Sequence, residues 1–363
     1  MIEHRRHGDI AILAIDHPPV NATSQAVRQG LLDGVHALLD DPAVAGIVLV
    51  GANGTFSAGG DVRELGDASR NAPSLSDTIR AIEASRKPVV AAMSGYALGG
   101  GLELALGCHW RIGMRPLRVG LPEVTLGLIP GAGGTQRLPA LVGATAALDL
   151  ITSGRHVEAD EACALGLLDE LVAAPLEASA VVFLRRLLEQ GRERRPPSDT
   201  DRSVDAGFFD AYRTAHGEQW RGLLAPWKAV EAIEARYRLP AAAAAACERS
   251  AYLECQGSAQ RAALSHVFVA RRKLRATRDE MRERTIAARL RAAVGDTAAE
   301  DLARPPSIAA IVEAARALVG EKLALSDDEI DIVAIDRLGF PQHRGGPMFA
   351  ARTRRPDDGS GAV

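Results

Sequence analysis

Residues 94–105 read SGYALGGGLELA, and this stretch sets the class of fold. The apolar run directly before it, PVVAAM at 88–93, is typical of a strand that is buried on both faces. Glycines 99–101 then open a helix that we expect to begin near Leu102, because glycine permits a sharp turn between a strand and a helix. A strand, a glycine-rich turn and a helix in this order predict one unit of an α/β fold.

The same alternation of strands and helices precedes this stretch. Residues 10–15 (IAILAI) and 46–50 (GIVLV) are continuous apolar runs that predict buried strands. Apolar side chains recur at helical spacing over 24–40, and residues 76–86 predict a further helix before the strand at 88–94. Because no strand alternates apolar and polar residues, both faces of the sheet must be covered. The sequence therefore predicts an α/β layered fold with mostly parallel strands.

Two glycine-bearing passages follow neighbouring strands. Residues 55–62 read TFSAGGDV and follow the strand at 46–50, whereas the stretch at 94–105 follows the next one. Open α/β folds bind ligands at the carboxyl ends of their strands, so N–H groups of both loops can converge on one ligand oxygen as an oxyanion hole. Either passage alone is better explained by tight turns that need positive φ. The interpretation depends on the two together.

Two glutamates lie in apolar surroundings near the glycine-rich passages. Glu103 follows the three glycines on the first turns of the helix, and Glu123 lies in a third passage, LPEVTLGLIPGAGGTQRL at 121–138. One such glutamate could be paired structurally or extend to solvent. Two of them suggest paired carboxyls in a dry pocket, where one acts as an acid and the other as a base. Sequence alone leaves open whether the two face each other.

Composition restricts the class of protein. The chain has 363 residues, 47% of them hydrophobic and 25% charged, and a formal net charge of −3 at pH 7. These values exclude a disordered chain and give no electrostatic basis for binding nucleic acid or an anionic membrane. We find no apolar run of about 18 residues and no apolar signal segment. The four cysteines form no CxxC pair, so we expect no disulfide framework, no metal site and a cytoplasmic location.

Over residues 1–190 the chain resembles the enoyl-CoA hydratase/isomerase (crotonase) family. The matching passages, in order, are PPVNATS at 18–24, FSAGGDV at 56–62, GYALGGGLELA at 95–105, LPEVTLGLIPGAGGTQRL at 121–138 and TSGRHVEADEACALGLLDELV at 152–172. The resemblance implies a crotonase-like spiral of ββα units that binds an acyl-CoA thioester, followed by a mostly helical carboxyl-terminal region.

The resemblance also implies roles for individual residues. They are the catalytic glutamates Glu103 and Glu123, the oxyanion-hole residues Ala58 and Gly100, and the CoA-binding residues Gly60 and Asp61. Glu103 would deprotonate water, and Glu123 would protonate the substrate at C2. The presence of both glutamates favours hydration. No metal or redox cofactor is implied, since CoA is part of the substrate.

The rest of the chain resembles parts of multifunctional β-oxidation enzymes, which fuse a hydratase/isomerase to a 3-hydroxyacyl-CoA dehydrogenase. Residues 191–275 resemble their helical linker and 276–349 their last helical domain. This resemblance rests on three passages: LLAPWKAVEAIEARYRLP at 223–240, GSAQRAALSHVFVARRK at 257–273 and LALSDDEIDIVAIDRLGFPQHRGGPMF at 323–349. An alanine run at 241–246 favours helix by propensity alone.

No dinucleotide-binding glycine fingerprint follows a strand after residue 190, so we expect no NAD and no dehydrogenase activity. The apolar face of 276–349 should dock on the chain's own helices at 220–275 or on a second subunit. Residues 350–363 predict a disordered tail.

These observations predict reversible hydration of trans-2-enoyl-CoA to 3-hydroxyacyl-CoA, as in fatty-acid β-oxidation. Two alternatives stay open. One is a Δ3,Δ2-enoyl-CoA isomerase in which Glu123 alone moves the proton, and the other is a non-catalytic acyl-CoA-binding or scaffold subunit. The expected partner is an acyl-CoA thioester, and either a homo-oligomer or an association with other β-oxidation enzymes is compatible with the sequence. Acyl chain length is not predicted.

Overall fold

The chain forms two compact units in a computed structural model that describes residues 1–61, 64, 72–192 and 204–353. The first unit comprises the described residues of Met1–Val124, Ile129–Gln219 and Ala225–Leu253. The second comprises Thr125–Leu128, Trp220–Leu224 and the described residues from Glu254 onward. Residues 191–275, expected to form a linker of their own, are thus divided between the units.

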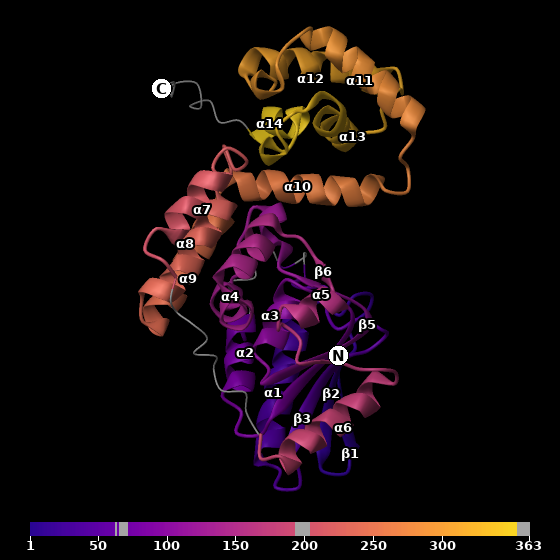
Figure 1. Ribbon diagram of the computed structural model, residues 1–363. Coiled ribbons are helices and arrows are strands. Elements are labelled where there is room, and N and C mark those ends of the chain that lie inside the picture. Colours follow the sequence, from indigo (N-terminus) through magenta and orange to yellow (C-terminus); the bar gives the residue numbers. More distant parts are fainter. Residues whose placement is uncertain (62–63, 65–71, 193–203, 354–363) are drawn as a thin grey trace. The chain divides into compact units, whose positions relative to one another are not determined.

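A seven-stranded sheet organises the first unit (Figure 1). Strands β2 to β5 run parallel in the order β2-β3-β4-β5, whereas β1 and β6 pair antiparallel at either end of the path, and β7 pairs with β5. The strands are β1 (Ile2–His7), β2 (Ile10–Ile15), β3 (Gly46–Gly51), β4 (Val89–Leu98), β5 (Trp110–Gly120), β6 (Val157–Glu158) and β7 (Glu170–Leu171). The predicted α/β fold with mostly parallel strands is confirmed.

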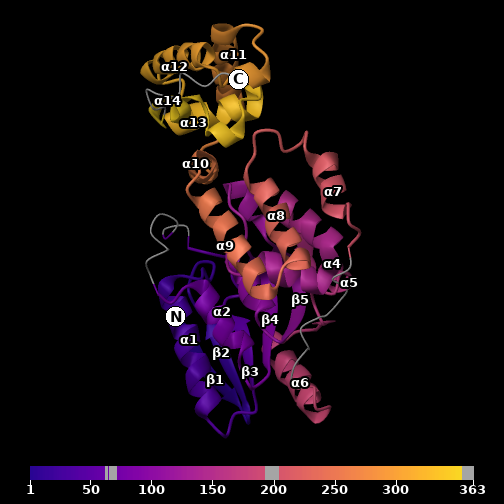
Figure 2. The same cartoon turned by 90° about the vertical axis from the view of Figure 1, so that its left-hand side faces the viewer.

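Helices cover both faces of this sheet. Figure 2 shows α6 on one side of it and α1 and α2 on the other. The buried side chains of α6 form one core with alternate residues of β2 to β5, and this double cover explains why every residue of β2 is buried. The helices are α1 (Gln25–Asp40), α2 (Leu75–Glu83), α3 (Gly100–Leu106), α4 (Gly134–Ser153), α5 (Ala159–Ala164), α6 (Leu176–Glu189), α7 (Phe208–His216), α8 (Ala225–Arg238) and α9 (Ala241–Gln256).

The glycine-rich stretch differs from its prediction at both ends. Strand β4 continues to Leu98, and α3 begins at Gly100 rather than near Leu102. The strand is irregular between Met93 and Gly95. Gly95 has a φ of +63°, and a Cβ atom there would lie 2.1 Å from the Gly54 carbonyl oxygen. The close approach of another backbone, rather than a turn, therefore requires this glycine.

The second unit is helical and has its own hydrophobic core. Val267, Ala270 and Leu274 of α10 pack against Ile332 of α13, which confirms for α10 that the 276–349 segment docks on the chain's own helices. The helices are α10 (Ala259–Leu274), α11 (Glu280–Val294), α12 (Pro305–Gly320), α13 (Asp327–Val333) and α14 (Pro347–Thr353). A disordered tail was expected over 350–363, but residues 350–353 belong to α14. The remainder of that segment lies outside the described residues.

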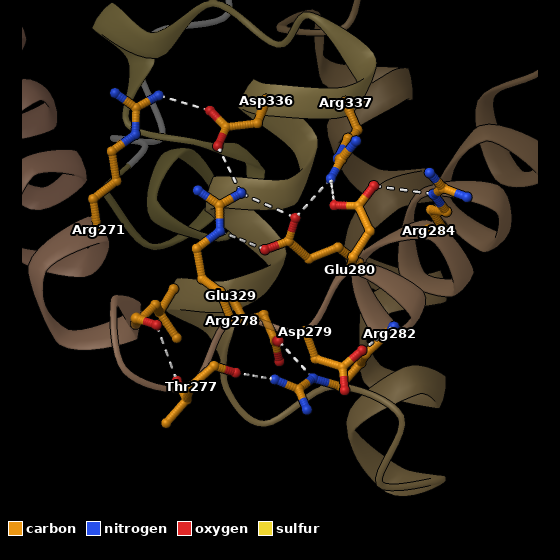
Figure 3. Close-up of polar contacts among 12 residues, drawn as sticks. Arg271, Thr277, Arg278, Asp279, Glu280, Arg282, Arg284, Glu329, Asp336 and Arg337 are labelled. Atoms are coloured by element: carbon orange, nitrogen blue, oxygen red, sulfur yellow. Dashed lines mark hydrogen bonds and ion pairs between the residues drawn. The ribbon is translucent and has the colours of Figure 1, made fainter.

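Ion pairs brace α11 against the segment that follows α13 (Figure 3). The Arg278 guanidinium donates to both carboxylate oxygens of Glu283, at 2.6 and 3.0 Å, and Arg337 donates to the same carboxylate at 3.0 Å. Hydrogen bonds from Arg278 hold the pKa of Glu283 below its usual range. Because Glu283 is buried, these partners are needed to offset the loss of water around its charge.

Within the described residues, no helix has both the length and the apolar character to cross a membrane.

Candidate active site

The loop after β3 runs beside β4 and ends close to α3. The Ser57 N–H donates to the Tyr96 carbonyl at 2.9 Å, and the Ser57 carbonyl accepts from the Leu98 N–H at 3.0 Å. These bonds extend the sheet by one short bridge. They bring Gly60 to the amino-terminal end of α3, so the two predicted glycine passages do meet.

Gly60 and Gly100 present two backbone donors at this meeting point. A Cβ atom built on Gly100 would lie 3.6 Å from the Gly60 nitrogen, so the two residues are near neighbours. In the described part of the chain, neither N–H donates to another group. Both are therefore available to a ligand oxygen.

Ala58 does not fit the role expected for it. Its N–H donates to the Val20 carbonyl oxygen at 2.9 Å, so the group is already committed within the loop. The expectation that the Ala58 and Gly100 N–H groups together hold a carbonyl oxygen therefore conflicts with this bond, whereas Gly60, two residues later, has an N–H beside Gly100 that donates to no described group. The sequence could not separate the two because both lie in the same short glycine passage.

Asp61 follows Gly60 and is buried. Its carbonyl accepts the Glu64 N–H at 2.9 Å, and the Glu64 carboxylate in turn accepts a hydrogen bond from the buried Arg28 at 2.8 Å. The loop that carries Gly60 is thus fixed to α1. The assignment of Gly60 and Asp61 to CoA binding stays a prediction.

Glu103 lies on α3 and is 3% exposed. Its Oε1 accepts two backbone hydrogen bonds, from the Ala132 N–H at 2.7 Å and from the Gly134 N–H at 2.9 Å. Burial raises the pKa of Glu103, while these two donors and the charge of Arg137 act in the opposite direction. The carboxylate form of Glu103 therefore has fixed partners in the protein.

Glu123 lies on the short helix η3 (Pro122–Leu126) and has a different environment. Its Oε1 is beside Gly99, where a Cβ atom would come within 3.0 Å of it. Gly99 also has a φ of +51° at the turn from β4 to α3. Glycine, which has no side chain, both adopts this φ readily and leaves room for the Glu123 carboxyl. Oε2 is shielded from solvent and has no hydrogen-bond partner among the described residues.

The two carboxyls are electrostatically linked and chemically unequal. Burial, and then the negative charges of Glu103 and Glu248, raise the pKa of Glu123 well above its usual range. Glu103 has two N–H donors and Glu123 has none from other residues in the described chain, so the surroundings favour the charged form of Glu103 and the protonated form of Glu123. This arrangement separates one base from one acid.

Glu248 is a third buried carboxyl that sequence reasoning missed. It lies on α9 and is 5% exposed. Its Oε1 accepts the Gly133 N–H at 2.8 Å, and its Oε2 accepts the Thr135 N–H at 3.1 Å and the Thr135 hydroxyl at 2.5 Å. Burial and the neighbouring charge of Glu103 raise the pKa of Glu248 to about 7. Its only signal in the sequence is an acidic residue shortly after the alanine run at 241–246.

Across the described ranges, no three His, Cys, Asp or Glu side chains are grouped so as to hold a metal ion. Cys108, Cys163, Cys247 and Cys255 form no disulfide in the described ranges.

Comparison with known protein sequences links the chain to one family. The family model for enoyl-CoA hydratase/isomerase matches residues 5–195. The peroxisomal bifunctional enzyme of Pongo abelii is 41% identical over 278 residues, which are 75% of this chain and 38% of that protein. The enzyme of the same name from Cavia porcellus is 43% identical over 274 residues, 72% of this chain and 37% of that protein. The chain spans less than two fifths of the length of these relatives.

Solved structures agree with the fold. An enoyl-CoA hydratase from Bacillus anthracis is 27% identical, with a TM-score of 0.50, over 74% of this chain and 95% of that one. The Pseudomonas aeruginosa protein DspI is 30% identical, also with a TM-score of 0.50, over 61% of this chain and 87% of that one.

Proposed function

The chain belongs to the enoyl-CoA hydratase/isomerase family, and we propose that it catalyses the reversible hydration of a trans-2-enoyl-CoA to a 3-hydroxyacyl-CoA. The proposed setting is fatty-acid β-oxidation, in line with the names of relatives such as the Arabidopsis thaliana multifunctional protein AIM1, 45% identical over 171 residues. A cytoplasmic location stays a prediction.

One observation carries the proposal: two buried carboxyls with opposite hydrogen-bonding environments. Glu103 accepts two N–H groups that favour its ionised form, from which a general base starts, and Glu123 is favoured in its protonated form, from which a general acid starts. Hydration requires both at once. A protein that only binds acyl-CoA would gain nothing from burying both groups at a cost in stability.

The proposed mechanism begins with the thioester carbonyl. Its oxygen accepts hydrogen bonds from the Gly60 and Gly100 N–H groups, which withdraw electrons from the conjugated double bond and make C3 electrophilic. Negative charge develops on this oxygen as the C3–O bond forms. Each such donor contributes about 10²–10³-fold in well-studied enzymes.

Proton transfer completes the addition. Glu103 accepts a proton from the attacking water while the water oxygen bonds to C3, and Glu123 gives its proton to C2. The product gains one water, and the two carboxyls have exchanged protonation states. In dehydration each takes the opposite role.

The direct test is the loss of conjugated enoyl absorbance when crotonyl-CoA is mixed with the purified chain. We expect substrate-dependent loss that both Glu103→Gln and Glu123→Gln reduce strongly. Absence of hydration for both short and long enoyl-CoA substrates would reject the proposal and leave isomerisation or acyl-CoA binding as the function.

Isomerisation of a 3-enoyl-CoA is a second candidate activity at the same site. Oε2 of Glu123, which has no hydrogen-bond partner among the described residues, favours it, because an isomerase needs one carboxyl that can move a proton between C2 and C4. Glu103→Gln separates the two activities: it should remove hydration and leave isomerisation.

A further inference from the structure

The Ala132–Thr135 segment binds two carboxylates with alternate N–H groups. Ala132 and Gly134 donate to Glu103, whereas Gly133 and Thr135 donate to Glu248. Successive N–H groups of the segment therefore point to opposite sides. Each carboxylate therefore holds a different pair of N–H groups of the same four-residue segment.

Glu248 reaches this segment from α9, which lies outside the residues 5–195 of the family match. Tyr252, one turn further along α9, also faces the segment, since a Cβ atom on Gly131 would come within 2.5 Å of its ring. Helix α9 thus lays two side chains against the loop that holds Glu103.

In the contact between the Thr135 hydroxyl and the Glu248 carboxylate, the hydroxyl is the donor. It accepts a hydrogen bond from the Gln136 side-chain nitrogen at 2.8 Å and donates to Glu248. Glu248 therefore accepts three hydrogen bonds within the first unit, and these bonds oppose the rise in its pKa that burial causes.

We infer that Glu248 is a positioning residue of the proposed hydratase site: it fixes the Ala132–Thr135 segment so that two N–H groups face Glu103. A charged Glu248 also acts on the neighbouring Glu123 carboxyl. The inference rests on the proposed function for its kinetic consequence. Its geometric part stands on the hydrogen bonds alone.

Several charges act on this site together. They are Glu103 from α3, Glu123 from η3, Glu248 from α9 and Arg137 from α4, which also pairs with Glu83 at 2.8 Å. Cys247, next to Glu248, has a raised pKa, chiefly through burial, and stays a neutral thiol. Removing the charge of Glu248 removes one of the causes that raise the pKa of Glu123. The pKa of Glu123 should therefore fall.

The test uses the full chain with Glu248→Gln, and with Glu254→Gln as the matched control on the exposed side of the same helix. We expect Glu248→Gln to lower kcat for crotonyl-CoA hydration at least tenfold with less than a threefold change in KM. The basic limb of its kcat/KM profile should move to lower pH, because the general acid loses its proton earlier. Glu254→Gln should change none of these.

A readout independent of activity separates the two proposals. The Glu123 carboxyl can be titrated by NMR in ¹³C-glutamate-labelled protein, with Glu123→Gln identifying its signal. A lower Glu123 pKa in Glu248→Gln supports the inference even if the wild-type chain hydrates no substrate, whereas an unchanged pKa overturns it. An active wild type with an unchanged pH profile in Glu248→Gln rejects the inference and leaves the proposed function intact.

A second pair of variants tests the inference in case Glu248→Gln does not fold. Thr135→Val removes the hydroxyl donor and Thr135→Ser retains it. We expect Thr135→Val to reduce kcat and Thr135→Ser to restore it. Equal activity of both would contradict the inference.

Discussion

Oε1 of Glu103 accepts two backbone N–H hydrogen bonds, whereas Oε2 of Glu123 accepts none from the described part of the chain. Two buried carboxyls that are alike in covalent structure are thereby made different in basicity. The difference comes from the backbone of the 132–134 segment, and it is the basis on which we propose Glu103 as the base and Glu123 as the acid.

The first prediction concerns these two carboxyls. Glu103→Gln and Glu123→Gln should each lower kcat for hydration by about 10²–10⁴-fold with a modest change in KM, because a general acid or base contributes that much to the chemical step. Steady-state kinetics with crotonyl-CoA measure this. Glu231→Gln, at an exposed ion pair on α8, is the control. Near-wild-type rates in both active-site variants would show that the roles are wrong.

The second prediction concerns stability and pH. The folded state binds the Glu123 proton more tightly than the unfolded chain does, since burial raises this pKa. Its effect on stability is therefore most favourable at low pH and is lost as the pH rises from the ordinary glutamate range through the folded-state pKa. Glu123→Gln should gain stability over the wild type as pH increases, measured by chemical denaturation from pH 5 to 9. A constant difference would argue against a raised pKa.

The third prediction distinguishes Gly60 from Ala58. Replacing the backbone N–H of residue 60 with an ester oxygen, by protein semisynthesis, should lower kcat about 10²–10³-fold. The same replacement at residue 58 removes the bond to the Val20 carbonyl, so we expect lower thermal stability with far less effect on kcat. The opposite pattern would restore Ala58 to the oxyanion hole.

The fourth prediction concerns redox chemistry. The chain should neither bind NAD with micromolar affinity nor oxidise 3-hydroxyacyl-CoA, because no dinucleotide-binding fingerprint follows a strand after residue 190. Calorimetry with NAD checks the first part and NADH absorbance the second. A clear calorimetric signal for NAD binding would contradict this prediction.

The fifth prediction concerns the second unit. Deleting residues 276–363 exposes the apolar face formed by Val267, Ala270 and Leu274 of α10. The shortened chain should lose solubility or change its oligomeric state, and the soluble fraction should keep some hydratase activity. Size-exclusion chromatography and the crotonyl-CoA assay measure the two effects. A soluble, unchanged and inactive product would show instead that the segment contributes to the site.

Local sequence signals were sufficient for the strands at 10–15 and 46–50 and for the helix at 24–40, because continuous apolar runs and helical spacing reflect burial directly. Glu103 and Glu123 were also recognisable, since each interrupts apolar sequence beside glycines. The choice between Ala58 and Gly60 was not, because it depends on one hydrogen bond to Val20. Such a bond leaves no pattern in composition or periodicity.

Glu248 could not be predicted from the sequence for a different reason. Its partners Gly133 and Thr135 are more than 110 residues away in sequence, and the alanine run before it predicts only helix. Which face of α9 meets the site is set by tertiary packing, and no periodicity within α9 itself indicates it.

The alternating hydrogen bonds of the Ala132–Thr135 segment also bear on how such genes recombine. An exchange that transferred only residues 5–195 to another chain would leave Glu248 behind, and the recipient would have to offer an acceptor for the Gly133 and Thr135 N–H groups. The segment that must be transferred intact to keep the proposed site therefore extends at least to α9. Gene fissions and fusions that keep such a site should occur beyond that helix, and seldom at residue 195, where the family match ends.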